Sequence, residues 1–454
     1  MATTPVTEHN EPSTPPGAPA TERERKRLHT KLKLATQIGQ GIDGYIIGGI
    51  GLAMGAITDD LHLTSVEQGL VGAAPLIGIF VGGPLFGRLA DRFGRRPVFL
   101  IDMLIFLVGS VLQFFVGDGT QLFLIRLVMG VAIGGEYAIG APLLSEYAGR
   151  RGRGRLLASL EISWYLGYAL ATVVGALFTS VDGGWRWSLA SSAVIALVCV
   201  TLRGGIPESA RWLLSQGRRD EAEALIEKYG IEVDVAAELD ERDEVRRDGF
   251  RALFSRQHIR STVFASVFWA ALVLPYFAIG TFWTDVFEAL HMGDNAVAAL
   301  LVYSFTAVAG VTAGCLVVER IGRRKLLIPP FWITAGCLAL VAVWPSSTPV
   351  IVVGFLFFIF LNAASSALTA VYPLEVFPTS LRTTGVGFAT AMSRVGAAIG
   401  TFLLPMGLDH FGAEFVLLVG AGVLVVGAVV SQFLAPETTD LDLARAARTA
   451  REGA

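Results

Sequence analysis

The sequence is poor in charge, in cysteine and in histidine. Only 17% of its 454 residues are charged, whereas 53% are hydrophobic, and the mean hydropathy is +0.58. The three cysteines lie in apolar runs without the spacing of a disulfide framework or a metal site, and residues 1–30 contain no apolar signal segment. The sequence also contains no nucleotide-binding loop and no nucleophile constellation. These absences argue against an enzyme, a metal site and a bound cofactor, and the composition predicts a polytopic membrane protein.

Twelve apolar runs are long enough to cross a bilayer, which takes about 20 helical residues. They lie near residues 34–57, 67–87, 98–117, 121–145, 156–179, 185–203, 260–284, 295–318, 326–345, 349–371, 384–406 and 412–434. We therefore predict an all-α integral membrane protein with twelve transmembrane helices. Its expected parts are a disordered cytoplasmic tail (1–33), a six-helix bundle (34–203), a cytoplasmic linker with short amphipathic helices (204–258), a second six-helix bundle (259–435) and a cytoplasmic tail (436–454).

The charges outside these runs are sorted by loop. Lys and Arg concentrate at 88–96, 150–155, 320–325 and Arg382, whereas the intervening turns carry Asp and Gly, as at Asp59-Asp60 and Asp409-His410. Because basic loops stay on the cytoplasmic side during insertion, we expect both termini to be cytoplasmic in a plasma-membrane protein.

The two halves of the sequence repeat. Several landmarks recur at an offset of 229 positions (375 − 146), namely Glu146 with Glu375, Arg153 with Arg382, and Pro207-Glu208 with Pro436-Glu437. Such a fixed offset is hard to explain by chance and indicates an internal repeat.

The loop Gly87-Arg88-Leu89-Ala90-Asp91-Arg92-Phe93-Gly94-Arg95-Arg96-Pro97 resembles the signature loop between the second and third helices of the major facilitator superfamily. A weaker echo lies at 319–324, and Pro207-Glu208-Ser209 resembles the sequence after the sixth helix of the sugar-porter branch. The resemblance covers about residues 34–440. It implies two pseudo-symmetric six-helix bundles that move a small solute by alternating access, with the substrate site between them near mid-membrane.

A ring of charged residues at the cytoplasmic ends matches the salt-bridge gate that, in this family, locks the halves together when the cavity faces outward. Several charge pairs at one closable interface would form a latch whose energy differs between two states, whereas exposed single pairs are worth only about 0–1 kcal/mol. The alternative, that these charges only set the insertion topology, explains the basic residues but not the acids among them. The predicted gate residues are Asp91, Arg92, Arg96, Glu146, Arg153, Glu208, Arg211, Glu319, Arg320, Arg324, Glu375, Arg382 and Glu437.

A charge inside an apolar run costs at least a few kcal/mol unless it faces a partner or a water-filled cavity. Asp43 and Arg126, on the first and fourth runs, resemble the acid and the arginine that proton-coupled sugar porters use for coupling. A carboxylate whose guanidinium partner moves away during the cycle gains affinity for a proton, so such a pair can bind and release one proton. The alternative is a static pair that only orients two helices.

A stripe on the fifth run combines one acid with three aromatic residues. Glu161, Trp164, Tyr165 and Tyr168 are spaced i, i+3, i+4 and i+7, which places them on one face of a helix. Because a lipid-facing stripe would not hold an acid, we expect this face to line a substrate cavity. The alternative is an aromatic packing face in which Glu161 is bonded to a neighbouring helix.

The tenth and eleventh runs carry further polar groups. Asn362, Ser365, Ser366 and Thr369 share one helical face and suit either substrate contact or close helix packing. Arg394 lies about 15 Å inside the eleventh helix, at 1.5 Å per residue. It is expected either to pair with a buried acid such as Glu136, itself a candidate substrate residue, or to bind an anionic substrate, because a guanidinium fork fits a carboxylate.

The seventh run departs from the sugar-porter pattern. Sugar porters usually carry hydroxyl-binding amides there, whereas this chain has Pro275 with aromatic residues that include Tyr276 and Trp283, which we expect to contact the cargo. The difference favours a less hydroxylated or aromatic cargo, as in the metabolite and aromatic-acid proton symporters, which also tend to carry an arginine on helix eleven.

We therefore expect a monomeric transporter in the lipid bilayer that moves a small organic or aromatic acid by proton symport, with the proton as coupling ion and no nucleic-acid partner. Three alternatives remain open. The first is a sugar or polyol symporter, the second is a proton-coupled drug exporter, and the third is a nutrient sensor that has lost transport.

Overall fold

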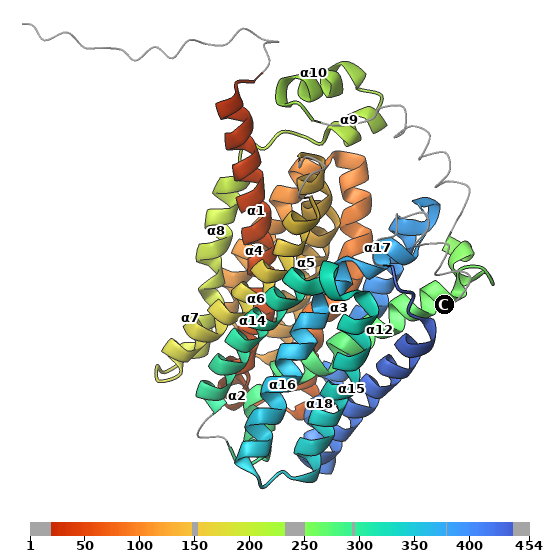
Figure 1. The fold of residues 1–454 in the computed structure, drawn as a ribbon. Coiled ribbons are helices and arrows are strands. Elements are labelled where there is room, and N and C mark those ends of the chain that lie inside the picture. Colours follow the sequence, from red (N-terminus) through yellow and green to blue (C-terminus); the bar gives the residue numbers. More distant parts are fainter. Residues whose placement is uncertain (1–19, 148–152, 232–249, 293–295, 378, 439–454) are drawn as a thin grey trace, which may run out of the picture.

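The computed structural model describes residues 20–147, 153–231, 250–292, 296–377 and 379–438, and within these ranges every regular element is a helix. The N-terminal half holds six spans (Figure 1). They are α1 (Glu22–Gly48) continued by α2 (Ile50–Leu61), α3 (Ser65–Phe93), α4 (Arg95–Phe114), α5 (Gly119–Tyr147), α6 (Arg153–Phe178), and α7 (Gly184–Ala190) continued by α8 (Ser192–Arg203).

The C-terminal half is built in the same way. Its elements are α12 (Ile259–Thr281) continued by α13 (Trp283–Ala289), α14 (Ala296–Ile321), α15 (Arg323–Val343), α16 (Thr348–Ser366) with η3 (Ala367–Ala370) and α17 (Tyr372–Val376), and α18 (Thr379–Leu434). Eleven helices of the described residues are long and apolar enough to cross a membrane. The last of them, α18, bends at Gly412 (φ 80°) and holds two spans, so the predicted number of twelve is reached.

The linker between the halves contains short helices, as the sequence suggested. Helices α9 (Ala210–Ser215) and α10 (Arg219–Tyr229) lie together beyond one end of the bundle, and the 3-10 helix η1 (Phe250–Phe254) precedes α12 (Figure 1). We call this end of the bundle the α9 end, and we call the other end, where α2 lies, the far end.

Two predicted boundaries differ from the structure. The tail was expected to reach residue 33, but α1 begins at Glu22, because Thr21 and Glu24 form a capping box that satisfies the first N–H groups of the helix. The turn between the last two spans was expected at Asp409-His410 and lies instead at Gly412, where a positive φ that other residues rarely adopt ends the first span.

The internal repeat is visible in the hydrogen bonds at the α9 end. The Glu208 carboxylate accepts from the first two backbone N–H groups of α4 at 2.9 and 3.2 Å. The Glu437 carboxylate accepts from the first two N–H groups of α15 at 3.0 and 3.1 Å. A negative charge at a helix N-terminus satisfies free N–H groups and complements the helix dipole. The two glutamates, 229 positions apart (437 − 208), therefore do the same structural work in the two halves.

Helices in each half approach closely through glycine. A Cβ atom added at Gly167 of α6 would lie 1.8 Å from the carbonyl oxygen of Gly41 in α1, and one added at Gly314 of α14 would lie 2.1 Å from that of Ala364 in α16. At these distances there is no room for a side chain. The glycines therefore let the helix backbones pack directly against each other, which stabilises helix pairs in a membrane.

We expect Gly167→Ala to lower the thermal stability of the purified protein, because the new methyl group must push α1 and α6 apart. Overpacking of this kind typically costs about 1–3 kcal/mol. Gly336→Ala is the matched control, because a Cβ atom at this position of α15 meets nothing within 4 Å. Unfolding is measured by tryptophan fluorescence in detergent, and equal midpoints for the two variants would contradict the close approach.

Candidate functional site

Three charged side chains contact one another inside the N-terminal half. The Arg203 guanidinium, at the end of α8, contacts Asp102 of α4 through Nη1 (2.8 Å) and Glu136 of α5 through Nη2 (2.6 Å), and all three side chains are completely buried. Arg203 also donates to the carbonyl oxygen of Phe99 and stacks on its ring at 3.5 Å. We call Asp102, Glu136 and Arg203 the buried triad.

The triad revises the expectation for Glu136 and adds two residues that the sequence analysis missed. Glu136 was expected to meet Arg394 or a substrate, but its Oε2 atom is held by Arg203. Asp102 and Arg203 were overlooked although each is a charge at or inside an apolar run. That property, the same one that singled out Asp43, was the signal that could have found them.

The triad lies directly against α1, next to Asp43. A Cβ atom added at Gly39 would lie 2.4 Å from both Arg203 Nη2 and Glu136 Oε1. Asp43 follows Gly39 by one helical turn and is fully buried, and neither of its carboxylate oxygens has a hydrogen-bond partner. Its electrostatic neighbours are Glu136, Asp102, Arg203 and Arg394. Two acids and two arginines therefore surround Asp43, and with its own carboxyl group the acids number three.

Arg126, the predicted partner of Asp43, is bonded elsewhere. Its Nε atom donates to the carbonyl oxygen of Val71 (3.3 Å) and its Nη2 atom to that of Ile46 (3.5 Å), while Nη1 is buried without a partner. The ion pairs of the described residues do not include one between Arg126 and Asp43. A coupling role for this pair stays a prediction.

Arg394 of α18 is the buried cation of the C-terminal half that faces the N-terminal half. Its guanidinium lies 5.4 Å from the ring centre of Tyr137 in α5 and 5.7 Å from that of Phe277 in α12. Its Nε atom is buried without a hydrogen-bond partner, and no described ion pair includes it. Glu161 of α6 lies within its electrostatic reach. Arg394 therefore sits at the boundary of the halves with spare hydrogen-bonding capacity.

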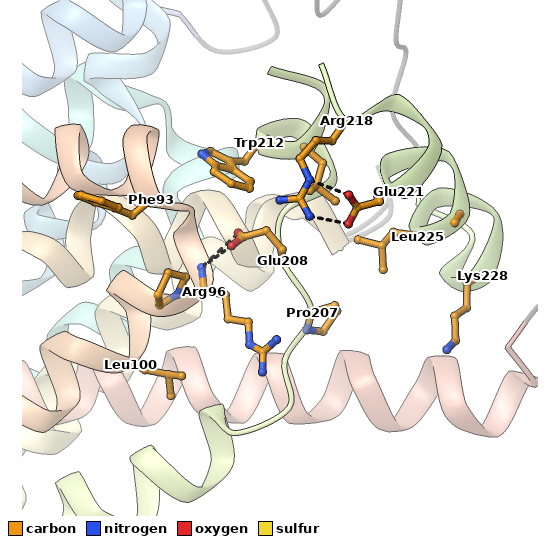
Figure 2. A pocket seen from close by; sticks show the side chains of 13 residues that line it. Phe93, Arg96, Leu100, Pro207, Glu208, Trp212, Arg218, Glu221, Leu225 and Lys228 are labelled. Atoms are coloured by element: carbon orange, nitrogen blue, oxygen red, sulfur yellow. Dashed lines mark hydrogen bonds and ion pairs between the residues drawn. The ribbon is translucent and has the colours of Figure 1, made fainter. Parts of the chain in front are cut away.

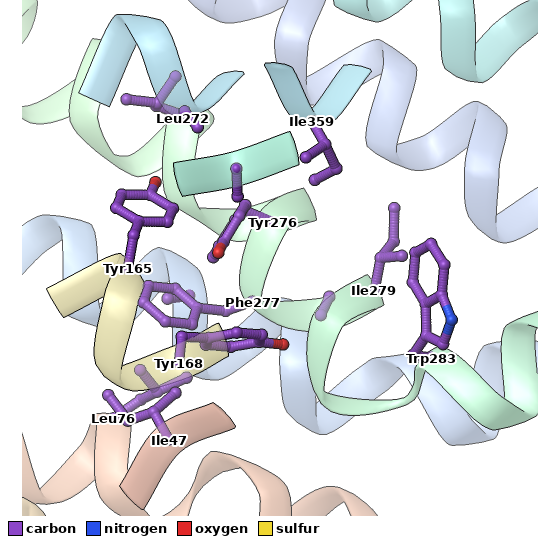
Figure 3. Packing of buried hydrophobic residues seen from close by; sticks show 14 of the residues in the cluster. Ile47, Leu76, Tyr165, Tyr168, Leu272, Tyr276, Phe277, Ile279, Trp283 and Ile359 are labelled. Carbon is purple, nitrogen blue, oxygen red and sulfur yellow. The ribbon is translucent and has the colours of Figure 1, made fainter. Parts of the chain in front are cut away.

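The aromatic stripe of α6 faces the other half, where it meets aromatic residues of α12 (Figure 3). Ring centres are 5.8 Å apart for Tyr165 and Tyr276, 6.2 Å for Tyr168 and Tyr276, and 5.8 Å for Trp164 and Phe277. In this conformation, these rings fill the space between the halves and pack against one another. They form one continuous apolar layer on the far-end side of Arg394.

Trp283, another predicted substrate residue, lies apart from that layer (Figure 3). Its indole Nε1–H donates to the carbonyl oxygen of Ala296 (3.1 Å), and its ring stacks on Phe287 with centres 4.3 Å apart. Both partners belong to the C-terminal half, so in this conformation the described contacts of Trp283 are structural.

The polar stripe of α16 is likewise engaged with backbone. Side-chain donors of this stripe bond to backbone carbonyl oxygens at 2.7 to 3.0 Å, and two of the bonds reach neighbouring helices. Asn362 donates to Leu272 of α12, and Ser365 donates to Leu326 of α15. Helix packing, the alternative for this stripe, accounts for these contacts.

The described contacts at the predicted gate lie within single halves. Arg323, which was not predicted, contacts Glu375 (3.0 Å), and Arg382 donates to the carbonyl oxygen of Leu374 (2.9 Å). Arg324 bonds carbonyl oxygens near the end of α18. Asp91, Arg92, Arg96 and Arg320 are exposed, Arg211 is half-buried, and the side chains of Glu146, Arg153 and Glu319 lie outside the described residues. A latch between the halves stays a prediction.

Two of the gate residues also line a surface groove of about 710 Å³ between α4, α9 and α10 (Figure 2). Glu208 bonds to the backbone N–H of Arg96 there, and Arg218 pairs with Glu221 at 2.6 Å. The groove contains none of the predicted substrate residues. Its position outside the helix bundle argues against a role as the transport site.

Contacts between the halves close the far end. Tyr168 of α6 donates to the carbonyl oxygen of Gly280 in α12 (3.1 Å), and Thr172 bonds Ser304 of α14 (3.0 Å). A Cβ atom at Gly69 of α3 would lie 2.3 Å from a carbonyl oxygen of α18. The aromatic layer and these bonds therefore separate Asp43 and Arg394 from the far end.

Comparisons with known proteins agree with this architecture. A family model described as "Sugar (and other) transporter" matches residues 21–449. The inner membrane metabolite transport protein YgcS of Escherichia coli is 38% identical over 92% of this chain and 94% of its own length. The niacin transporter NiaP of Acinetobacter baylyi is 27% identical over 91% of this chain and 95% of its own.

The solved structures agree on the fold. The proton:xylose symporter XylE, of the major facilitator superfamily, was solved with bound 6-bromo-6-deoxy-D-glucose. It has a TM-score of 0.75 at 20% identity, over 93% of this chain and 99% of that chain. An inward-open structure of XylE from Escherichia coli has a TM-score of 0.78 at 19% identity, with the same two coverages. At these identities the likeness shows the fold.

We expect Tyr168→Phe to open the far end more often, because the lost bond to Gly280 joins the two halves. A neutral hydrogen bond is worth about 0.5–1.5 kcal/mol, or about two- to tenfold in the population of the open state. The measurement is the maleimide-labelling rate of Thr401→Cys, at the buried contact of α18 with α3, in a background without the three native cysteines.

Tyr45→Phe is the matched control for this experiment. Tyr45 is also buried, but its hydroxyl bonds Ser191 within the N-terminal half (2.6 Å), so the labelling rate should not change. Equal rates in the two variants would show that the Tyr168 bond does not hold the far end closed.

Proposed function

The chain belongs to the sugar (and other) transporter family of the major facilitator superfamily, and on that premise we propose that it carries a small organic acid across the membrane together with a proton. Membership of the family makes it an integral membrane transporter of small metabolites or sugars and not an enzyme. The proposal adds the acidic cargo, which is aromatic in its favoured form, and the coupling ion.

The observation that carries the proposal is the state of Arg394. A buried guanidinium without an ion pair is costly, so its charge is expected to have a counterion during the cycle. The sequence left Glu136 as the chief competitor for this charge, and Glu136 is held by Arg203. A cargo carboxylate arriving between the halves would meet the Arg394 fork beside the rings of Tyr137 and Phe277.

The aromatic form of the cargo is supported by the residues around Arg394. Tyr165, Tyr168 and Tyr276 extend the aromatic surface from Phe277 toward the far end. A flat aromatic cargo could stack on these rings or meet them edge to face. The likeness to a niacin transporter points the same way, because niacin combines an aromatic ring with a carboxylate.

Proton coupling is supported by the position of Asp43. Its carboxyl group is buried without a hydrogen-bond partner, so in its charged form it would carry the full cost of burial. A proton removes that cost. We propose that Asp43 binds the coupling proton, that the halves alternate by opening the far end and closing the α9 end, and that the α9 end faces the cytoplasm together with both termini.

A sugar or polyol cargo is the second candidate. The family includes sugar transporters by its description, and the fold is that of a xylose symporter. A transport assay of Arg394→Ala separates the two candidates, because a neutral sugar carries no charge for Arg394 to bind.

We expect Arg394→Ala to raise the KM for an acidic cargo in proteoliposomes supplied with labelled nicotinate, benzoate or xylose. Loss of a hydrogen bond to a charged group costs about 1.5–3 kcal/mol, which is about ten- to a hundredfold in affinity. Arg394→Lys should lie between, because it keeps the charge without the planar fork. Arg256→Ala, at an exposed position, is the control. Unchanged KM for the transported acid would remove Arg394 from the site.

For Asp43→Asn, we expect accumulation driven by a pH gradient to be lost while counterflow exchange persists, because the amide cannot release a proton but leaves the cargo site intact. Both activities are measured with the cargo found in the panel, and Asp59→Asn at the exposed far end is the control. Equal loss of both activities in folded protein would contradict the coupling role.

A further inference from the structure

The buried triad and Asp43 together hold more acid than base. Three carboxyl groups, those of Asp43, Asp102 and Glu136, surround one contacting guanidinium, that of Arg203. Arg203 can neutralise one of the two carboxylates that touch it. The second would remain as a charge with no exposure to water, which costs several kcal/mol in a protein interior. The triad is therefore expected to hold one proton.

The unpartnered atoms show where that proton can lie. Glu136 Oε1 and Asp102 Oδ2 are buried without hydrogen-bond partners, while the other oxygen of each carboxyl group contacts Arg203. Glu136 Oε1 points at α1, since it lies 2.4 Å from a Cβ atom built at Gly39. Asp43 is the next residue on that face of α1, so the free oxygen of Glu136 is directed toward the helix face that carries Asp43.

Three other groups that titrate or carry charge lie close by among the described residues. Tyr137 of α5 lies within electrostatic reach of Asp43. Cys199 of α8 lies near Arg203 and donates to the carbonyl oxygen of Ala35 in α1 (3.4 Å). The C-terminal half contributes Arg394, which lies within electrostatic reach of Asp43. Because Arg394 belongs to the moving partner half, its distance from the acids changes when the halves rock, whereas Arg203 moves with them.

We propose that Asp102, Glu136 and Arg203 form a second proton-holding centre, which exchanges its proton with Asp43 through Glu136. The exchange begins after the triad has released its own proton toward the α9 end. The O–H bond of the Asp43 carboxyl group then breaks and a new O–H bond forms at the Glu136 carboxylate, so Asp43 becomes a carboxylate and the triad again holds one proton. Arg203 stays protonated, and the total charge is unchanged. The triad contacts α1 one turn nearer the α9 end than Asp43. It is therefore an intermediate binding site for a proton that moves from Asp43 toward that end.

This inference rests on the proposed proton coupling at Asp43, and its test is a separate measurement. The full chain in lipid nanodiscs is titrated while infrared difference spectra record the carbonyl stretch of protonated carboxylic acids. Among its signals, the wild type should show one from Asp43 and one from the triad. Asp43→Asn should remove one of them, and Glu136→Gln should remove the other, because glutamine has the shape of the protonated acid without its proton. Glu288→Gln, at the exposed far end, should remove neither.

The outcomes are distinct. If Glu136→Gln removes no protonated-acid signal, the triad holds no proton and the inference is overturned. If Asp43→Asn retains accumulation driven by a pH gradient, the proposed coupling fails instead, whatever the spectra show.

A stability measurement supplies a second readout that does not depend on transport. Arg203→Met should lower the unfolding midpoint, because it leaves two carboxyl groups without a cation. Adding Asp102→Asn and Glu136→Gln should restore the midpoint, since the cluster is then neutral and of similar shape. If Arg203→Met alone is as stable as the wild type, the triad is not balanced by charge, and the inference also fails.

Discussion

The cost of placing a charge in the membrane interior governs this structure. Arg203 shows the solution most clearly, because it is fully buried, is shared by Asp102 and Glu136, and is stacked on Phe99. The surrounding helices are arranged to make that contact possible, with a glycine at residue 39 so that α1 can pass over the charged atoms. Fixed charges of this kind hold the N-terminal half together as one body, and what they leave unbalanced is available for proton chemistry.

The two halves share the glutamate caps at the α9 end but not the buried charges. Glu208 and Glu437 cap equivalent helices at the α9 end, so the repeat preserves the structure of the hairpins. At the same offset of 229 (437 − 208), Glu136 corresponds to Ser365 and Arg203 to Gln432, so the second half carries no triad. The acids lie in one half, and Arg394 belongs to the other. Relative movement of the halves therefore changes the balance of charge around Asp43, which is the physical basis on which binding and protonation can be linked.

The aromatic layer shows which state of this movement the structure represents, namely one in which the far end is closed. The rings of α6 and α12 and the bond from Tyr168 to Gly280 close the far end, while the described gate contacts at the α9 end stay within single halves. The same side chains thus serve as packing in this state and are candidates for cargo contact in another. That double use explains why their spacing alone could not separate the two interpretations.

The sequence by itself determined the class, the twelve spans and the repeat, because the length of an apolar run and the charge of a loop are local properties that the bilayer tests one segment at a time. It also singled out Asp43, Glu161 and Arg394 as charges that need a reason. Only the tertiary structure decided which charge meets which. In the tertiary structure Arg203 pairs with both Glu136 and Asp102. Arg126 donates to backbone carbonyl oxygens and does not pair with Asp43. Ion pairing between helices depends on rotation and depth, which no single segment encodes.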